Sequence, residues 1–206
     1  MLHRLRSSIH VANMLVQICA TAVGLLLALG LDQWKSERAH RETARQARGF
    51  ILEELKLNQK EVLREVEVTR AGLAQLRPLQ AKHLKGERID KHPLERVQFS
   101  LATLRASAWQ TSMATQAVTH MEPWRVARIS EAFAMQGDLD EVHRSLMAAI
   151  PTMSRLLVAE HPEQVPTFAA DLATLITFFE MDLGSARDTL KTYEAAMAAC
   201  QDVPPR

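Results

Sequence analysis

VANMLVQICATAVGLLLALGL, residues 11–31, contains no charged side chain over 21 positions. As an α-helix this stretch is about 31 Å long, close to the roughly 30 Å hydrocarbon thickness of a bilayer. Its polar side chains are Asn13, Gln17 and Thr21, all in the first half. A soluble amphipathic helix would instead repeat polar residues along one whole face. The stretch therefore predicts one transmembrane helix, with the lipid bilayer as its surroundings.

Small and amide side chains share one face of this predicted helix. They recur at spacings of three and four residues, at Asn13, Gln17, Ala20, Gly24 and Ala28. Such a face lets a second helix approach closely in lipid, and amides hydrogen-bond across the contact. A helix–helix contact is one interpretation; the other is that small residues are simply common in membrane helices.

A cleaved signal peptide is the alternative to a retained membrane helix. Arg4 and Arg6 supply a positive start, and Ala28-Leu29-Gly30 resembles a cleavage site. However, the apolar run is longer than the 7 to 15 residues that are usual in signal peptides. We therefore interpret the helix as retained.

Charge is distributed unevenly although the net charge is +1. Residues 1–92 hold 16 basic and 10 acidic side chains, whereas residues 93–206 hold 9 and 14. Base-stacking aromatic clusters and nucleic-acid-reading motifs are absent from the sequence, so a nucleic-acid partner is not expected. The positive-inside rule is weak for long domains and leaves the orientation open. Trp34, just after the apolar stretch, suits an interfacial anchor.

Residues 32–85 predict a long, coiled-coil-like stalk helix. Acid–base pairs such as Glu61 and Arg64 recur at helical spacing on its exposed side. Its apolar seam has a repeat near 3.5 residues, interrupted by Asn58 and Thr69. The seam consists of Ile51, Leu55, Val62, Val66, Leu73 and Leu76. Its partner is either a second copy of the chain or the later helices, because spacing alone does not distinguish them.

The remaining sequence predicts shorter amphipathic helices after a loop at residues 86–93. Pro93 begins the first, with Leu94, Val97, Leu101 and Leu104 on one face; Ser107 begins the second. Pro123 begins a third that ends at Gly137.

Asp138 and Glu141 form a capping-box pattern for the next helix, and Gly184-Ser185 separates the last two helices. The expected fold is all-α, since no segment alternates with a period of two. The chain then divides into a tail (1–10), a transmembrane helix (11–31), a stalk (32–85), a loop (86–93), a helical bundle (94–201) and a disordered tail (202–206).

The sequence shows no catalytic or metal-binding motif, so neither an enzyme nor a cofactor is expected. Its nearest approach to a ligand cluster is Asp138, Asp140, Glu141 and His143. Helix capping and solvent exposure explain these four residues better than a metal does.

Large aromatic side chains are few, and three of them are candidates for the lining of a ligand pocket. They are Trp109, Trp124 and Tyr193. Core packing is the preferred interpretation, because Trp109 and Tyr193 lie in helical apolar stripes.

Two short motifs resemble a family of bacterial single-pass inner-membrane proteins of unknown function. The first is Gly24-Leu25-Leu26-Leu27-Ala28-Leu29 followed by Asp32-Gln33-Trp34, and the second is Ser107-Ala108-Trp109-Gln110-Thr111. In that family a Gly-Ala pair follows the second motif, whereas this chain has Gln116-Ala117. The resemblance implies a C-terminal domain on the periplasmic side of the inner membrane and transfers no catalytic residue.

These observations predict a non-enzymatic, membrane-anchored helical protein that binds protein partners and self-associates. The alternative is an extracytoplasmic sensor domain, in which the later helices enclose a small ligand and the stalk carries the response.

Overall fold

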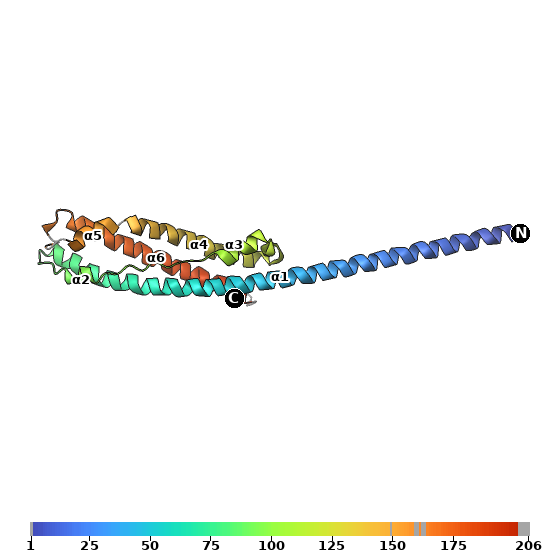
Figure 1. The fold of residues 1–206 in the computed structure, drawn as a ribbon, viewed down its shortest axis with the longest axis horizontal. Coiled ribbons are helices and arrows are strands. Elements are labelled where there is room, and N and C mark those ends of the chain that lie inside the picture. The colour runs from blue at the N-terminus through green and yellow to red at the C-terminus, as the bar shows by residue number, and fades with distance from the viewer. Residues whose placement is uncertain (1, 149, 159–160, 162–163, 202–206) are drawn as a thin grey trace. The chain divides into compact units, whose positions relative to one another are not determined.

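The computed structural model describes residues 2–148, 150–158, 161 and 164–201, while the side chains of 2–16, 18–20, 22, 28, 152–153 and 157–158 lie outside the description. The described residues form helices and no strands, which confirms the all-α prediction. The elements are α1 (Leu2–Leu84), α2 (His92–Glu95), α3 (Ser107–Ala114), the 3-10 helix η1 (Ala117–His120), α4 (Pro123–Ala148), α5 (Ile150–Val158) and α6 (Phe168–Cys200) (Figure 1).

Among the described residues, none of the helices combines the length and the apolar character needed to span a bilayer. In the predicted membrane segment, residues 11–31, the side chains at 17, 21, 23–27 and 29–31 are described and the others lie outside the description. The predicted disordered tail, residues 202–206, also lies outside the described residues.

The chain divides into two compact units, and the boundary between them lies within α1, between Arg45 and Gln46. The first unit, Met1–Arg45, contains α1 from Leu2 to Arg45. The second unit, Gln46–Arg206, contains the rest of α1 and all later elements. The boundary therefore lies inside the segment predicted as a stalk.

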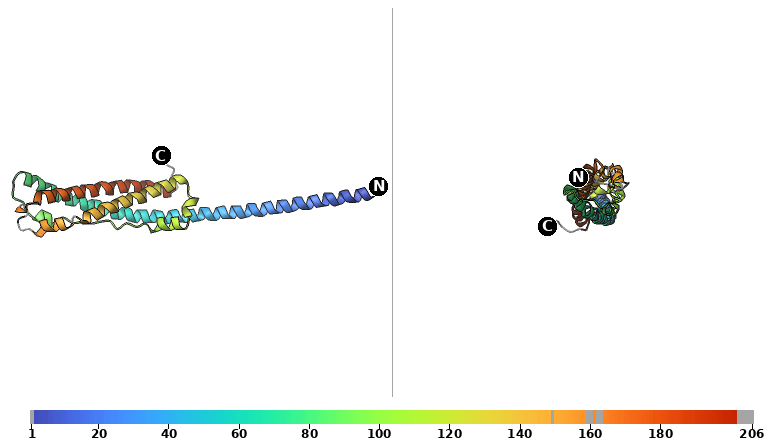
Figure 2. Two further views of the ribbon diagram at one scale, coloured as in Figure 1. Left: turned by 90° about the horizontal axis from the view of Figure 1, so that it is seen from above. Right: turned by 90° about the vertical axis from the view of Figure 1, so that its left-hand side faces the viewer.

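Three long helices lie side by side in the second unit: α1 from Gln46, α4 and α6 (Figures 1 and 2). The chain passes along α1, returns as the non-helical segment 97–106, passes along α4 and returns along α6. Because an extended segment makes the first return, α1 and α4 run in the same direction and α6 runs opposite to both.

The apolar seam of α1 faces the later helices of the same chain. Its side chains from Ile51 to Leu79 are at most 6% exposed. In the core, Leu73, Leu76 and Leu79 join Phe168 and Phe179 of α6. Burial of each large aliphatic side chain contributes about 1.5–3 kcal/mol, so the seam stabilises this unit. The sequence left two possible partners for this seam, a second copy of the chain or the later helices. In the structure the seam packs against the later helices.

The helix predicted from Pro93 through Leu104 is wrong. Helix α2 ends at Glu95, and residues 97–106 are not helical. Polar side chains of α1 bond the backbone of this segment: Glu65 Oε2 accepts from Ala102 N at 3.2 Å, and Asn58 Oδ1 accepts from Arg105 N at 3.0 Å. These bonds satisfy backbone amides that a helix would otherwise have satisfied internally.

The helix ends predicted at two glycines are also wrong, because α4 continues through Gly137 and α6 through Gly184. Asp138 and Glu141 are exposed side chains within α4, so they do not form a cap, and Ser185 lies inside α6. A glycine costs a helix only about 1 kcal/mol relative to alanine. The buried stripes on both sides outweigh that cost and keep each helix continuous.

Candidate functional site

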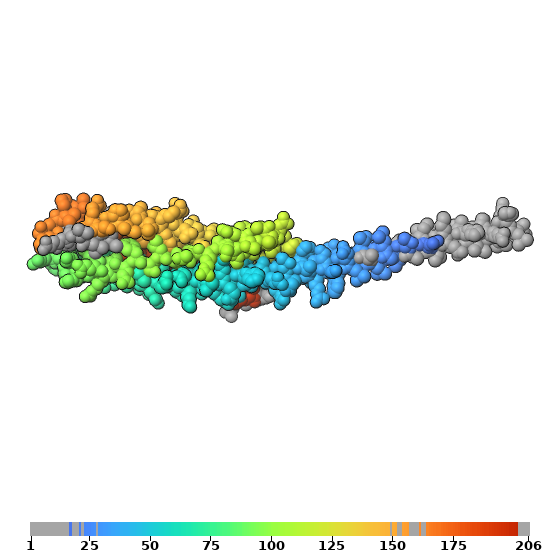
Figure 3. Space-filling model, in the orientation of Figure 1, coloured from blue at the N-terminus to red at the C-terminus, as the bar shows by residue number. Residues whose placement is uncertain are grey.

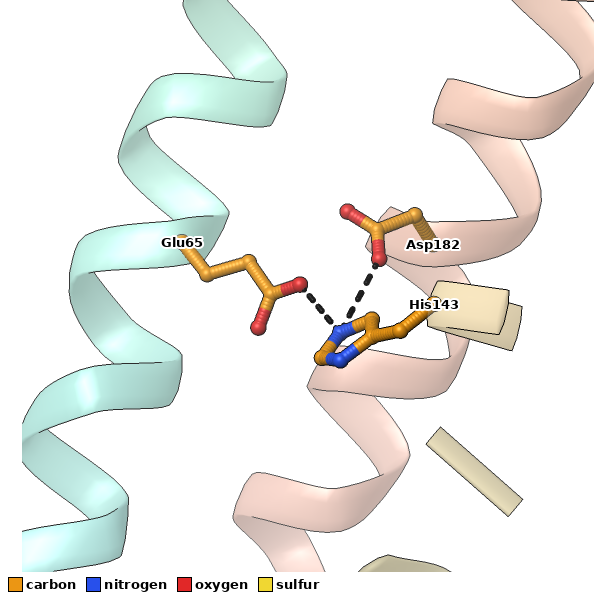
Figure 4. A group of neighbouring side chains, drawn as sticks. All are labelled: Glu65, His143 and Asp182. Atoms are coloured by element: carbon orange, nitrogen blue, oxygen red, sulfur yellow. Dashed lines mark ion pairs between the residues drawn. The ribbon is translucent and has the colours of Figure 1, made fainter. Parts of the chain in front are cut away.

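Three of the buried ionisable side chains of the second unit meet in its core, one from each long helix (Figure 4). Glu65 comes from α1, His143 from α4 and Asp182 from α6; their exposed side-chain fractions are 0%, 8% and 1%. Charged groups are rarely buried so fully without a partner, because desolvation is costly. We call these residues the triad.

Three atoms of the triad converge on one point. His143 Nε2 lies 2.5 Å from Glu65 Oε1 and 3.6 Å from Asp182 Oδ1, and the three atoms lie within 4.8 Å of one another. Figure 4 shows both carboxylates directed at the same ring nitrogen. A single imidazole nitrogen therefore faces two acids.

The other oxygen of each carboxylate is held from outside the triad. Ala102 N donates to Glu65 Oε2 at 3.2 Å, and Thr69 Oγ1 donates to Asp182 Oδ2 at 2.7 Å. These bonds fix the carboxylates with Oε1 and Oδ1 turned inward. At Glu65 Oε1, His143 Nε2 and Asp182 Oδ1 themselves, the close contacts do not meet hydrogen-bond geometry.

Burial and mutual charge shift the acid–base properties of the triad. Burial, followed by the charge of Glu65, raises the pKa of Asp182 to about 7. Burial acts to lower the pKa of His143, but contact with Glu65 and the charges of Asp182 and Asp140 outweigh it and raise that pKa. Asp182 and His143 therefore hold protons at higher pH than exposed residues of the same types do.

A second buried polar layer provides a comparison, about two helical turns from the triad on α1 and α4. Tyr193 Oη donates to Gln136 Oε1 at 2.9 Å, and Asn58 Nδ2 donates to the same oxygen at 3.1 Å. Gln136 Nε2 and Asn58 Nδ2 both donate to the carbonyl oxygen of Arg105. The polar groups of this neutral layer have hydrogen-bond partners within the protein, so we interpret the layer as structural.

The aromatic residues singled out from sequence have different surroundings. Trp109 is buried and stacks on Phe133, with ring centroids 5.7 Å apart, and Tyr193 is fully buried. Trp124 is 36% exposed, with the Arg125 guanidinium 4.6 Å from its ring centroid. Trp109 and Tyr193 are therefore buried side chains of the second unit, whereas Trp124 is exposed.

The residues predicted for the membrane contact stay a prediction. The side chains of Asn13, Ala20 and Ala28 lie outside the description, and Gln17 and Gly24 are exposed within the single chain. Trp34, the predicted interfacial anchor, is 60% exposed, and the Arg38 guanidinium lies 5.8 Å from its ring centroid.

Sequence reasoning missed the triad, and its expectation of an exposed His143 is wrong. Asp138, Asp140 and Glu141, with which His143 forms a group in the sequence, are all exposed. Two signals were available in the sequence. His143 lies four residues after Leu139 and three before Leu146, on the buried stripe of α4, and Glu65 falls on the three-and-four repeat of the α1 seam.

The fold and the triad together define an all-α protein whose helical core contains a buried carboxylate–histidine–carboxylate group. Comparison with protein-family models, with curated proteins and with solved structures finds no match. The resemblance to a bacterial inner-membrane family stays a prediction.

Proposed function

We propose that this chain is a membrane-anchored helical protein that presents its second unit to protein partners at the bilayer surface. The observation that carries the proposal is a run of exposed apolar side chains in the first unit. Val23, Leu25, Leu26, Leu27 and Leu29 are 55–68% exposed. The space-filling view draws the described side chains of the first unit in blue (Figure 3).

The distribution of these side chains around the helix favours lipid over water. Successive residues of an α-helix are about 100° apart, so Leu25, Leu26 and Leu27 already point in three different directions. An amphipathic helix leaves a polar face for water, whereas the other positions among these side chains are Gly24 and Ala28, which are not polar. Trp34 and the charged residues after it then suit the headgroup region.

Self-association belongs to the first unit in this proposal. The seam of α1 between Ile51 and Leu79 is buried within the chain, so it is not available to a second copy. The small-residue face of residues 13–28 is the proposed contact between copies. The protein partner is proposed to contact the second unit.

Fractionation of cells that express the full-length chain tests the anchor. We expect the wild-type chain to stay in the membrane pellet after carbonate extraction. Replacing Thr21 and Val23 by lysine should release a large fraction of the chain, because these residues lie at the middle of the stretch 11–31 and a charge at the centre of a membrane helix costs about 2.5–3.5 kcal/mol on insertion scales. The matched control is the exposed pair Leu57 and Leu63 of the second unit, whose replacement by lysine should leave the chain in the pellet.

A wild-type chain that carbonate extracts as readily as the lysine variant would refute the anchor. The contact between copies is tested by replacing Gly24 with leucine in a membrane dimerisation reporter. We expect a weaker signal, and an unchanged signal would discard contact through this face. A C-terminal reporter that is active on one side only tests the proposed periplasmic location of the second unit.

The triad favours a second candidate function, a sensor domain on a membrane stalk. The triad brings together three buried polar atoms that make no regular hydrogen bonds, so it is a better candidate for a ligand site than Trp109, Trp124 or Tyr193. In this candidate, ligand binding links α1, α4 and α6. It requires that the triad bind something.

A further inference from the structure

We propose that Glu65, His143 and Asp182 bind one divalent transition-metal ion, with Glu65 Oε1, His143 Nε2 and Asp182 Oδ1 as its ligands. This inference goes beyond the anchoring function and does not depend on it.

The spacing of the three atoms fits a small metal ion. Ligand atoms about 2.1 Å from a tetrahedral ion are about 3.4 Å apart. His143 Nε2 lies 2.5 Å from Glu65 Oε1 and 3.6 Å from Asp182 Oδ1, and all three atoms lie within 4.8 Å of one another. These separations bracket the required value. Shifts of about 1 Å in side chains on three separate helices would therefore complete the ligand set.

Charge balance favours a divalent cation at this point. A metal ion would displace the protons that Asp182 and His143 hold, which leaves both carboxylates ionised and the imidazole neutral. The triad then carries a charge of −2, and a buried charge of this size is strongly unfavourable without compensation. One divalent ion cancels this charge and takes the electron pairs of the three convergent atoms.

The surrounding hydrogen bonds are those that a metal site needs. Thr69 and the Ala102 amide hold the oxygens that do not face His143, which orients each carboxylate for binding through its inner oxygen. Partners of this kind typically change metal affinity by 10–100-fold when they are removed. The neutral layer around Asn58 has no such inward-facing atoms, because its hydrogen bonds are made within the layer.

One imidazole and two carboxylates select the class of ion. Imidazole binds zinc, iron and similar transition metals, whereas calcium and magnesium prefer sets of oxygen ligands. A surface hollow of about 590 Å³, lined by Asp140, His143, Arg144 and Met147, adjoins the triad. This hollow gives an ion or a water molecule a route to His143.

Titration of the purified full-length chain in mild detergent, stripped with EDTA, tests the proposal. We expect Zn²⁺ to bind at one ion per chain, with a dissociation constant on the order of 1 µM or tighter. Co²⁺ should give the visible absorption of a low-coordinate nitrogen–oxygen site. Zn²⁺ should also raise the melting temperature, since it binds only the folded state.

Near-isosteric variants assign the site. Glu65→Gln and Asp182→Asn each remove a proposed ligand and should weaken Zn²⁺ binding by about 100-fold. Thr69→Val removes only a hydrogen-bond partner of a ligand, so it should weaken binding by about 10-fold. Circular dichroism of each variant checks its folding. The matched control is His92→Gln, which removes an exposed histidine that lies 3.1 Å from Glu95, and it should leave the affinity unchanged.

X-ray absorption of the Zn²⁺-loaded wild-type chain covers the case in which a variant does not fold. We expect one imidazole and oxygen ligands, without sulfur. The proposal is overturned if wild-type protein shows no saturable binding at one ion per chain, if both folded triad variants keep wild-type affinity, or if the spectrum lacks imidazole. Zn²⁺ binding by a chain that carbonate releases from membranes would refute the anchor and leave the metal site standing.

Discussion

Glu54 on α1 caps helix α3 through Ser107, a residue 53 positions later in the chain. Ser107 Oγ donates to Glu54 Oε2 at 2.7 Å, and the backbone amides of Ala108 and Trp109 donate to the same carboxylate. Ala106, at the N-cap position, supplies no side-chain hydrogen bond. A carboxylate near the first turn of a helix accepts its unpaired amides and interacts favourably with the helix dipole. Glu54 therefore acts as a capping residue from another helix.

Replacing Glu54 by alanine should destabilise the second unit by about 2 kcal/mol, because buried hydrogen bonds to a charged group are lost. Urea denaturation followed by circular dichroism measures the change. The neighbouring Glu53 is the matched control: it pairs with Lys56 on the surface, and its side chain is 68% exposed. Glu53→Ala should change the stability by less than about 0.5 kcal/mol. Equal losses in the two variants would contradict the capping role.

Gly72 of α1 allows the ring of Phe179 on α6 to pack directly against the helix backbone. A Cβ atom at residue 72 would lie 2.4 Å from Phe179 Cε1, well inside van der Waals contact. We expect Gly72→Ala to destabilise the unit by about 1–3 kcal/mol through overpacking. Thermal and urea denaturation measure the loss. In a Phe179→Leu background the same substitution should cost less, because the two sites are in contact.

Gly184 of α6 is the matched control for Gly72. It also lies inside a long helix, but a Cβ atom at residue 184 would have no neighbouring atom within 4 Å among the described residues. Gly184→Ala should therefore stabilise the protein by about 0.5–1 kcal/mol through helix propensity. A stabilising effect at position 72 as well would show that the Phe179 contact does not limit the side chain there.

In the presence of EDTA the chain should lose stability as the pH rises from 5 to 8. Burial and the charge of Glu65 raise the pKa of Asp182 from 3.8 in its ordinary state to about 7, so between these values the folded state holds a proton that the unfolded state has released. Stability falls with pH wherever the folded state binds more protons. His143, whose pKa is also raised by the facing Glu65, Asp182 and Asp140, extends the loss above pH 6.5. Urea midpoints measured across this range check the direction.

Asp182→Asn is the control for the pH effect. The amide cannot titrate, although it still has an oxygen that can accept from Thr69 Oγ1. We expect a shallower fall between pH 5 and 7 in this variant than in the wild-type chain. Identical slopes would mean that the triad does not govern the pH dependence.

The polar residues of the α1 seam show what a local sequence pattern predicts and what it does not. The repeat places Asn58 and Thr69 on the seam, and both are buried, at 1% and 5% exposure. Their partners were not predictable, because Asn58 bonds Gln136 and Thr69 bonds Asp182, which are 78 and 113 residues away. The same alternation of four and three residues continues from Val62 to Glu65 and then to Thr69, so the repeat marks Glu65 as a buried acid but does not identify its partners.

The sequence by itself determined the all-α fold, the apolar stretch of residues 11–31 and the face of α1 that is buried. These are local properties, since periodicity and composition act through neighbours three and four residues apart. The tertiary structure alone decided that the seam packs on the same chain, that segment 97–106 is extended, and that Glu65, His143 and Asp182 meet. Their meeting depends on the relative register of three helices. The path of the connecting segments and the packing of whole side chains set that register, and neither leaves a periodic signal in the sequence.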